Sequence, residues 1–151
     1  MRLISRRGNT FGKQLENENT TGYIQHAYSL GFDVEVDFRL INGEWWLGHD
    51  KPEYKVDERW ILENKKYLWC HAKNIDAMYR LITFGTVEAF YHQTDDVTLT
   101  TGKYLWTYPG KRPLTNISIA VMPETADWNM KEFSECAGIC SDYIAGFKVE
   151  E

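Results

Sequence analysis

The segment from Val34 to Asp50 constrains the fold of this chain more than any other stretch. Apolar and polar residues alternate at its start, an Asn42-Gly43 pair interrupts the pattern, and the alternation then resumes. An Asn-Gly pair between two alternating runs is typical of a β-hairpin. Because successive side chains of a strand face opposite sides of the sheet, Glu35 and Asp37 share one face while their apolar neighbours share the other.

Two carboxylates on one face of an otherwise apolar strand need a positive partner. Burial disfavours each charged form, and the two negative charges also repel one another. Two interpretations stay open for Glu35 and Asp37: they bind a divalent metal ion, or they form ion pairs with Arg6 or Arg7. Either interpretation makes this strand a candidate functional site.

Composition limits the class of protein. A chain of 151 residues with 43% hydrophobic and 15% aromatic residues is long enough for one globular domain, expected to span residues 1–151. The net charge is -5 and no basic stripe is visible, so double-stranded nucleic acid is a poor partner. No segment approaches the ~20 apolar residues of a membrane helix, and the start lacks the apolar run of a signal peptide. We therefore expect a cytoplasmic protein with no transmembrane segment.

The three cysteines are Cys70, Cys136 and Cys140. An odd number without a secretory signal favours free thiols. Cys136 and Cys140 have the spacing of one helix face, but two thiols alone are a weak indication of zinc, and buried small apolar residues are the preferred interpretation.

Short strand-like runs alternate with helical patterns along the chain. The eight runs are Arg2–Ser5, Asp33–Phe38, Glu44–Leu47, Tyr67–His71, Glu88–His92, Lys103–Trp106, Asn116–Met122 and Gly138–Cys140. The expected helices run from a cap at Asn19 or Thr20 to Leu30, from Asp57 to about Asn64, from Asn74 to Phe84, and from Glu124 to about Cys136.

Strands that alternate with helices favour a parallel sheet, and eight of them are enough to close a barrel. A typical barrel has ~250 residues, and the links before Lys103 and Asn116 are too short for full helices. We therefore expect an α/β fold that is a compact, helix-depleted (β/α)8 barrel of the TIM type. An open α/β sheet with fewer strands is the structural alternative.

Polar residues gather where the expected strands end. These residues are Arg6-Arg7, Glu35 and Asp37, His49-Asp50, His71 with Lys73, His92-Gln93, Tyr108, Glu124 and Asp142. Because the carboxyl ends of parallel strands form the active face of α/β proteins, this repetition predicts a site at one end of the sheet.

Five short motifs carry a resemblance to a known family. They are Ile4-Ser5-Arg6-Arg7-Gly8, Glu18-Asn19-Thr20 at a helix start, Glu35-Val36-Asp37 on the second strand, His49-Asp50 after the third, and Gly138–Tyr143 near the end. In this order and spacing, the chain resembles glycerophosphodiester phosphodiesterases, members of the phosphoinositide phospholipase C-like barrel superfamily. The resemblance is strong over residues 1–50 and at the end of the chain, and thin between.

The resemblance implies a role for each matching residue. Glu35 and Asp37 would hold Mg²⁺ or Ca²⁺, since hard cations prefer oxygen ligands. His49 would act as acid or base, because the pKa of histidine lies near neutrality. Arg7 and Lys73 would contact the phosphate.

Other interpretations stay open for these residues. His49 is also compatible with a turn beside its aspartate, Arg7 with a structural ion pair, and Lys73 with a solvated surface position. His92 is a site residue or a helix cap. Trp106 and Tyr108 would shape a substrate wall, although aromatic residues are more often core.

Two positions depart from the family pattern. The family has a histidine where this chain has Arg6, and it has a Glu-x-Lys motif where this chain has His71-Ala72-Lys73. His71 is a nitrogen ligand in place of the carboxylate, a substitute acid or base, or a core histidine. An arginine stays protonated and cannot act as a base. Arg6 therefore marks a phosphate-binding pseudoenzyme, an enzyme that uses another base such as His71 or His92, a cation that replaces the metal charge, or an altered sequence.

The expected function follows from the resemblance. It is metal-dependent hydrolysis of glycerophosphodiesters or similar lipid-derived phosphodiesters, with a small-molecule substrate. The alternative is a catalytically impaired member that binds phosphate esters without turnover, and a purely structural domain is a third class.

Overall fold

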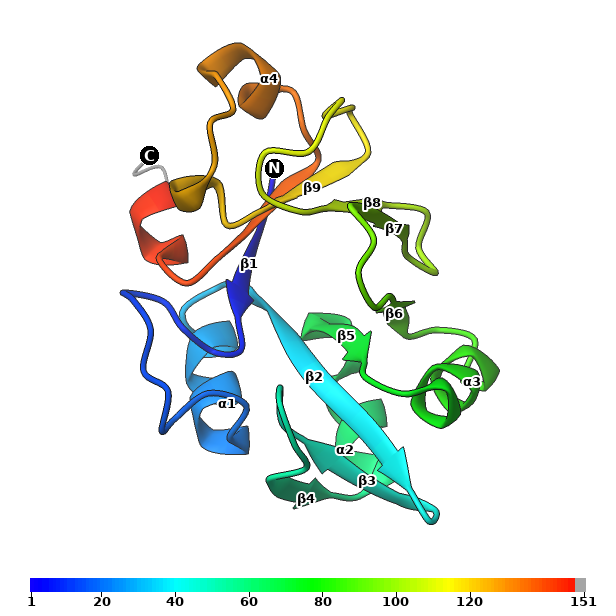
Figure 1. Cartoon of the computed structure of the whole chain (residues 1–151). Helices are drawn as coiled ribbons and strands as arrows, with labels where there is room; N and C mark the ends of the chain where they lie inside the picture. Colours follow the sequence, from blue (N-terminus) through cyan, green and yellow to red (C-terminus); the bar gives the residue numbers. More distant parts are fainter. Residues whose placement is uncertain (149–151) are drawn as a thin grey trace.

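The computed structural model describes residues 1–148, in which one ten-stranded sheet curls through the whole molecule (Figure 1). The strands are β1 (Arg2–Arg6), β2 (Asp33–Ile41), β3 (Glu44–Leu47), β4 (Tyr54–Val56), β5 (Leu68–Ala72), β6 (Glu88–Tyr91), β7 (Val97–Leu99), β8 (Leu105–Thr107), β9 (Ser118–Val121) and β10 (Gly138–Ser141). The helices are α1 (Thr21–Ser29), α2 (Glu58–Asn64), α3 (Ile75–Thr83) and α4 (Met130–Ser134), with 3-10 turns at Lys65–Tyr67, Pro123–Thr125 and Ile144–Phe147.

Strand β2 is the centre of the sheet. Its first half pairs in parallel with β1 on one edge and with β5 on the other. Its second half continues past the end of β1 and pairs antiparallel with β3. The register Ile41↔Glu44 leaves Asn42 and Gly43 as a two-residue turn, with φ of 51° and 78°. Positive φ at both positions is the requirement of a type I′ hairpin turn, so the sequence-based hairpin is confirmed.

The expected (β/α)8 barrel is wrong. Strands β8, β9, β10, β1, β2, β5 and β6 run parallel, but the expected third barrel strand, β3, is the return arm of a hairpin. Among the described residues, no strand ladder joins β6 to β8, so the sheet is a curled, mixed half-barrel. The physical reason is clear at β3: a parallel crossover needs a dozen or more residues, and only Asn42 and Gly43 join β2 to β3, so β3 must return antiparallel. In addition, no α-helix lies in the described chain between β6 and β9.

The free edge of β6 is covered by a side chain of β7 and by the loop after β7, and no strand ladder of the described residues joins β6 to β7. Thr98 donates its hydroxyl to the Tyr91 carbonyl oxygen at 2.9 Å, and the Thr101 amide donates to the Ala89 carbonyl oxygen at 2.9 Å. These contacts satisfy backbone groups that would otherwise remain exposed at an edge.

Three of the four expected helices are confirmed with their caps. The side chains of Thr20, Asp57 and Asn74 each accept a hydrogen bond from the backbone three residues later, at the start of α1, α2 and α3. The fourth expectation was too long. A 3-10 turn at Pro123–Thr125 comes first, and α4 begins only after a capping box formed by Asn129 and Glu132.

The alternation of strand side chains separates two cores. Outward-facing Val34, Val36 and Phe38 pack with residues of α1 and α3. A second cluster lies on the concave face of the curled sheet, below the polar carboxyl ends of the parallel strands. It consists of Ile4, Trp69, Phe90, Trp106, Ile119, Val121 and Cys140. All three cysteines are free and buried, as expected. No helix of the described residues has the length and apolarity needed to cross a bilayer.

Candidate functional site

The concave face becomes polar toward the carboxyl ends of the parallel strands. On strand after strand, the residue two positions beyond an inward apolar residue is polar: Arg6 follows Ile4, His71 follows Trp69, His92 follows Phe90, Tyr108 follows Trp106, and Asp142 follows Cys140. Since side chains two apart share a face, the strand pattern itself places these groups around one opening.

A cavity of about 320 Å³ opens there. It is lined by nearly all residues that the sequence indicated: Arg6, Arg7, Glu35, His49, His71, Lys73, His92, Trp106 and Tyr108, together with Gln93, Val121 and Cys140. Asp37, the remaining candidate, contacts Arg7 and His71. The structure therefore brings every candidate side chain to one place, and the volume lies at the small end for ligand pockets.

Glu35, Asp37 and His71 form a compact cluster of buried donors, which we call the acidic–histidine cluster. One ligand atom of each lies within 4.8 Å of the others. His71 Nδ1 is 3.3 Å from Asp37 Oδ1 and 3.5 Å from Glu35 Oε1. Asp37 Oδ1, Glu35 Oε2 and His71 Nε2 nevertheless have no hydrogen-bond partner. Buried polar atoms are rarely left unpaired, so the cluster has the character of a site that receives a cation.

One carboxylate oxygen of Asp37, Oδ2, is bound by neighbouring side chains, whereas Oδ1 is available to a ligand. Its Oδ2 accepts from the Asn19 side chain at 2.9 Å and lies 3.0 Å from Arg7 Nε. Its backbone amide donates back to the Asn19 side-chain oxygen at 3.1 Å. Burial alone would raise the pKa of Asp37, but the contacts with His71 and Arg7 and the Asn19 bond together hold it below the ordinary value. Asp37 is therefore an ionised, oriented carboxylate.

The two carboxylates of this cluster favour the protonated form of His71. Burial disfavours its imidazolium, but the neighbouring Asp37 and Glu35 carboxylates outweigh burial and raise the pKa of His71. Its ring also stacks on Phe90 at 4.8 Å and on His92 at 4.7 Å between ring centroids. The stacking and the carboxylates together fix the plane of the ring.

The arginine interpretation of the sequence is half confirmed. Arg7, not Arg6, pairs with Asp37, and it also reaches Glu18 at 3.1 Å. Arg6 instead pairs with Asp142 at 3.3 Å. Among the described residues, neither arginine lies within ion-pair distance of Glu35. Burial alone would lower the pKa of Arg6, but the nearby charges of Glu35 and Asp142 raise it. That Arg6 replaces the metal charge therefore stays a prediction.

A buried polar network supports both arginines. The Asn9 side chain donates to Glu18 at 2.9 Å and to Asp142 at 3.0 Å. Asn19 adopts a left-handed backbone, with φ of 64°, as does Arg7 at 58°. Non-glycine residues in this region cost of order 1–3 kcal/mol and persist only where the surroundings determine them. The backbone is therefore strained at Arg7 and Asn19, the two residues whose side chains contact Asp37 Oδ2.

Sequence reasoning missed the supporting role of this network. Glu18, Asn19 and Asp142 appeared in the motifs, but Asn19 was considered only as a helix cap, and the cap is Thr20. Asn9 gave no signal at all. Its importance arises because it joins two carboxylates that lie 124 residues apart, Glu18 and Asp142, and no local pattern reports such a contact.

His49 reaches the cavity because β3 ends early. In an ideal hairpin His49 would face away from Asp37. After Leu47, however, Gly48 adopts a φ of 150°, and its amide donates to the Asp37 carbonyl oxygen at 3.1 Å. The turn is tight: a Cβ on Gly48 would lie 2.0 Å from the Lys51 carbonyl oxygen. The irregular backbone at Gly48 redirects His49 into the site.

We expect Gly48→Ala to disturb the His49 loop. The new methyl group would collide with backbone at Lys51, whereas Gly43→Ala, with φ of 78° and open space around it, adds only the strain of a positive φ. Urea unfolding should show a larger loss of stability for Gly48→Ala than for Gly43→Ala. Equal losses would mean that the loop adapts freely.

His49 is oriented as a base. Its Nδ1 lies 2.7 Å from Asp50 Oδ1. Because an ionised carboxylate only accepts, Nδ1 carries the proton and Nε2 keeps a free lone pair. Burial and the nearby Arg7 charge lower the pKa of His49, which favours the neutral imidazole.

His92 and Tyr108 form the opposite, aromatic wall. The Tyr108 hydroxyl is in hydrogen-bond contact with His92 Nε2. Burial, followed by the charges of His71 and Lys73, lowers the pKa of His92 to about 4. His92 is therefore neutral near pH 7, and burial likewise keeps Tyr108 protonated by raising its pKa. Trp106 is 2% exposed and stacks on Phe90, so the core interpretation describes most of its surface.

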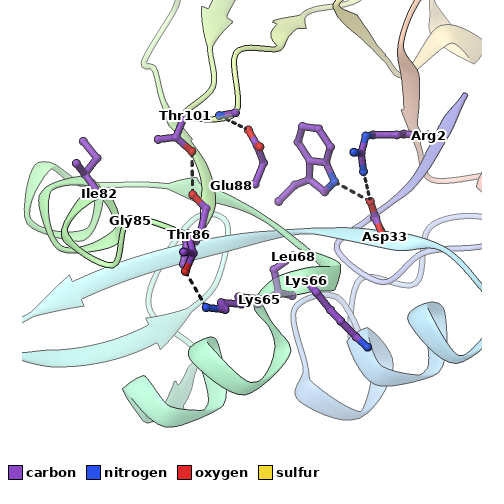
Figure 2. Close-up of a pocket in the computed structure, with 13 residues that line it drawn as sticks. Arg2, Asp33, Lys65, Lys66, Leu68, Ile82, Gly85, Thr86, Glu88 and Thr101 are labelled. Carbon is purple, nitrogen blue, oxygen red and sulfur yellow. Dashed lines mark hydrogen bonds and ion pairs between the residues drawn. The ribbon is translucent and has the colours of Figure 1, made fainter.

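A second cavity, of about 460 Å³, lies at the other ends of the strands (Figure 2). Several of its polar groups already have protein partners: Trp69 Nε1 donates to Asp33 at 3.1 Å, Lys65 to Thr86 at 2.7 Å, and the Gly102 amide to Glu88 at 3.0 Å. No unpaired buried side-chain atom of the described residues points to a ligand there. The cavity at the carboxyl ends is the better candidate.

Comparisons of the chain with protein-family models, with curated proteins and with solved structures found no match.

Proposed function

We propose that the protein is a divalent-metal-dependent phosphodiesterase that acts on small glycerophosphodiester-like substrates in the cytoplasm. The observation that carries the proposal is the acidic–histidine cluster, three buried donors with unpaired atoms, in one cavity with Arg6, Lys73 and His49. The motifs that resemble glycerophosphodiester phosphodiesterases supply the substrate class, and the three free thiols are in keeping with the compartment.

A phosphate group fits the charges that surround the cavity. Only Nη1 of Arg6 bonds to Asp142, which leaves its other guanidinium nitrogens to donate to a ligand. Lys73 lines the same cavity. Arginine and lysine donors suit phosphoryl oxygens and balance charge that grows on them during displacement.

The residues of the chain supply half of an acid–base pair. His49 Nε2 takes a proton from the attacking water or from the substrate's own hydroxyl. The new P–O bond forms as the P–O bond to the leaving alcohol breaks, which yields a phosphomonoester, or a cyclic phosphate if the nucleophile is internal. A bound metal ion would supply Lewis-acid stabilisation of the phosphoryl oxygens.

The leaving alkoxide also needs a proton, and Arg6 stands where the family has its other histidine. A guanidinium stays protonated and is a poor proton donor. This observation favours a second candidate function, a protein that binds phosphate esters and turns over only those with good leaving groups.

Metal-dependent hydrolysis tests the proposal. We expect the full chain to hydrolyse bis-p-nitrophenyl phosphate when Mg²⁺, Mn²⁺, Ca²⁺ or Zn²⁺ is added, and to lose that activity with a chelator. Glu35→Gln should abolish the metal-dependent rate, since it removes a charged ligand. Glu44→Gln, at an exposed ion pair with Lys55, is the matched control and should keep the rate.

If neither the native chain nor Arg6→His hydrolyses the substrate with any of these metals, the phosphodiesterase proposal is contradicted. Binding of glycerophosphocholine or glycerol phosphate without turnover, measured by calorimetry, would favour the second candidate function.

A further inference from the structure

We infer that His71 makes this a mixed nitrogen–oxygen metal site that selects Zn²⁺ over Mg²⁺ and Ca²⁺. The inference depends on the metal-binding part of the proposed function and not on hydrolysis. It concerns which ion the acidic–histidine cluster holds, and it departs from the hard cations that the Glu35 and Asp37 carboxylates alone would suggest.

Two of the three donor spacings fit one shared ion, and all three donor atoms lie within 4.8 Å of one another. His71 Nδ1 lies 3.3 Å and 3.5 Å from one oxygen of Asp37 and one of Glu35. Ligands bonded to zinc at ~2.0–2.2 Å with tetrahedral angles lie roughly 3.3–3.6 Å apart. Beyond this contact with His71, Asp37 Oδ1 has no hydrogen-bond partner, so this oxygen is available to an ion.

The chemistry of the donor set sets the preference. Imidazole suits zinc and other later transition ions, whereas carboxylate, carbonyl and water suit magnesium and calcium. Ca²⁺ takes six to eight oxygen ligands, and Mg²⁺ keeps several waters. The cluster offers one imidazole and two carboxylates, all with side chains no more than 9% exposed.

Three protein ligands with one side open match a catalytic zinc centre. Such centres bind zinc through three side chains and leave a position for water or substrate. Here Glu35 and His71 line the cavity, while Asp37 lies behind them. The remaining coordination positions would face the cavity that His49 and Lys73 also line.

The surrounding residues already orient the ligands. Asn19 and Arg7 hold Asp37 by Oδ2 and leave Oδ1 free. The rings of Phe90 and His92 both contact the His71 ring, at 4.8 Å and 4.7 Å between centroids. Because outer contacts of this kind fix ligand orientation and support metal affinity, the cluster is prepared for an ion before it binds.

The test compares metal selectivity between native protein and His71→Glu, which converts the cluster to three carboxylates. Metal-free full-length protein is titrated with Zn²⁺, Mn²⁺, Mg²⁺ and Ca²⁺ by calorimetry, with a chelating indicator in competition for the tight binders. We expect the ratio of the Mg²⁺ to the Zn²⁺ dissociation constant to fall about tenfold or more in His71→Glu. The control His26→Glu makes the same chemical change on the exposed face of α1 and should leave the ratio unchanged.

The ratio matters more than the Zn²⁺ affinity alone, because most nitrogen and oxygen sites bind zinc more tightly than magnesium. His71→Gln, which is neutral and does not add a third carboxylate, guards against misfolding of His71→Glu. It should lower Zn²⁺ affinity while circular dichroism and unfolding remain native-like.

Cobalt provides an independent readout on the native chain. Co²⁺ in a site of low coordination number absorbs visible light much more strongly than hexa-aqua Co²⁺. We expect an intense visible band that Zn²⁺ displaces and Mg²⁺ does not. An unchanged selectivity ratio in His71→Glu, or Co²⁺ that keeps the spectrum of the aqueous ion, would overturn the inference.

The outcomes separate this inference from the proposed function. Selective Zn²⁺ binding through His71 without any hydrolysis would support the inferred zinc selectivity and contradict the phosphodiesterase proposal. Hydrolysis supported equally by Mg²⁺ in native protein and in His71→Glu would support the proposed enzyme and contradict the inferred zinc selectivity.

Discussion

Arg6→His is expected to raise the hydrolysis of alkyl phosphodiesters, such as glycerophosphocholine, by ~10²–10⁴-fold. The reason is the missing proton donor. In the native chain His49 is arranged as a base, while the residue across the cavity is a guanidinium fixed on Asp142 at 3.3 Å. A histidine at this position would protonate the departing alkoxide.

The leaving group provides the control for this prediction. p-Nitrophenolate departs without a proton, so the rate on bis-p-nitrophenyl phosphate should change far less than the rate on glycerophosphocholine. Rates are measured at matched metal concentration, and each product is identified. An equal gain on both substrates would contradict a proton-donor role, since it would indicate that Arg6 simply obstructs the cavity.

The pH dependence follows from the same assignment. Burial and Arg7 lower the pKa of His49, so the active, neutral form persists to lower pH than for an ordinary histidine. The rate in native protein should therefore rise with pH along a single limb that lies below the usual histidine value. Arg6→His should add a second, descending limb as the new acid loses its proton.

Arg7→Met is expected to lower the free energy of unfolding by ~3–5 kcal/mol, the range for breaking a buried pair. Arg7 lies between Asp37, whose side chain is 0% exposed, and Glu18, whose side chain is 7% exposed. Methionine fills a similar volume but leaves two carboxylates buried without their cation, and Asn19 and Asn9 offset only part of that cost.

Urea unfolding followed by tryptophan fluorescence measures this loss. Arg80→Met is the matched control, because Arg80 pairs with Glu58 at 2.6 Å on the exposed surface and surface pairs contribute little. A bound divalent ion should recover part of the stability of Arg7→Met, since it would supply a charge beside Asp37. Equal effects of the two substitutions would show that the Arg7 network does not support the fold.

The comparison of sequence and structure shows which signals are local. All eight expected strand segments are present, and Thr20, Asp57 and Asn74 cap their helices as expected, because alternation and capping are properties of a few adjacent residues. The short strands β4 and β7 were missed. Each has only three residues, too few for an alternating pattern to be distinguished from loop.

The barrel expectation failed for the opposite reason. It treated β3 as one more parallel strand, although the Asn42-Gly43 turn already indicated an antiparallel return. Pairing partners are decided by the whole sheet. Strand β2 is long enough to bond to β1 and β3 on one edge, and no count of strand-like runs reveals that arrangement.

By itself, the sequence determined the inward-facing chemistry of this protein. Strand periodicity of two put Arg6, His71, His92 and Tyr108 on the same face as the apolar residues two positions before them, and it did so without knowledge of the fold. The same periodicity put Asp37 on one face with Glu35. Only the tertiary structure decided how these groups are paired. In the folded chain Asp37 pairs with Arg7, and Arg6 pairs with Asp142. The backbone at Gly48 directs His49 into the cavity. Atoms of Glu35, Asp37 and His71 remain without hydrogen-bond partners. The physical reason is that charge pairing depends on distances of 3 to 4 Å between residues far apart in the chain, and such distances exist only after the sheet has curled.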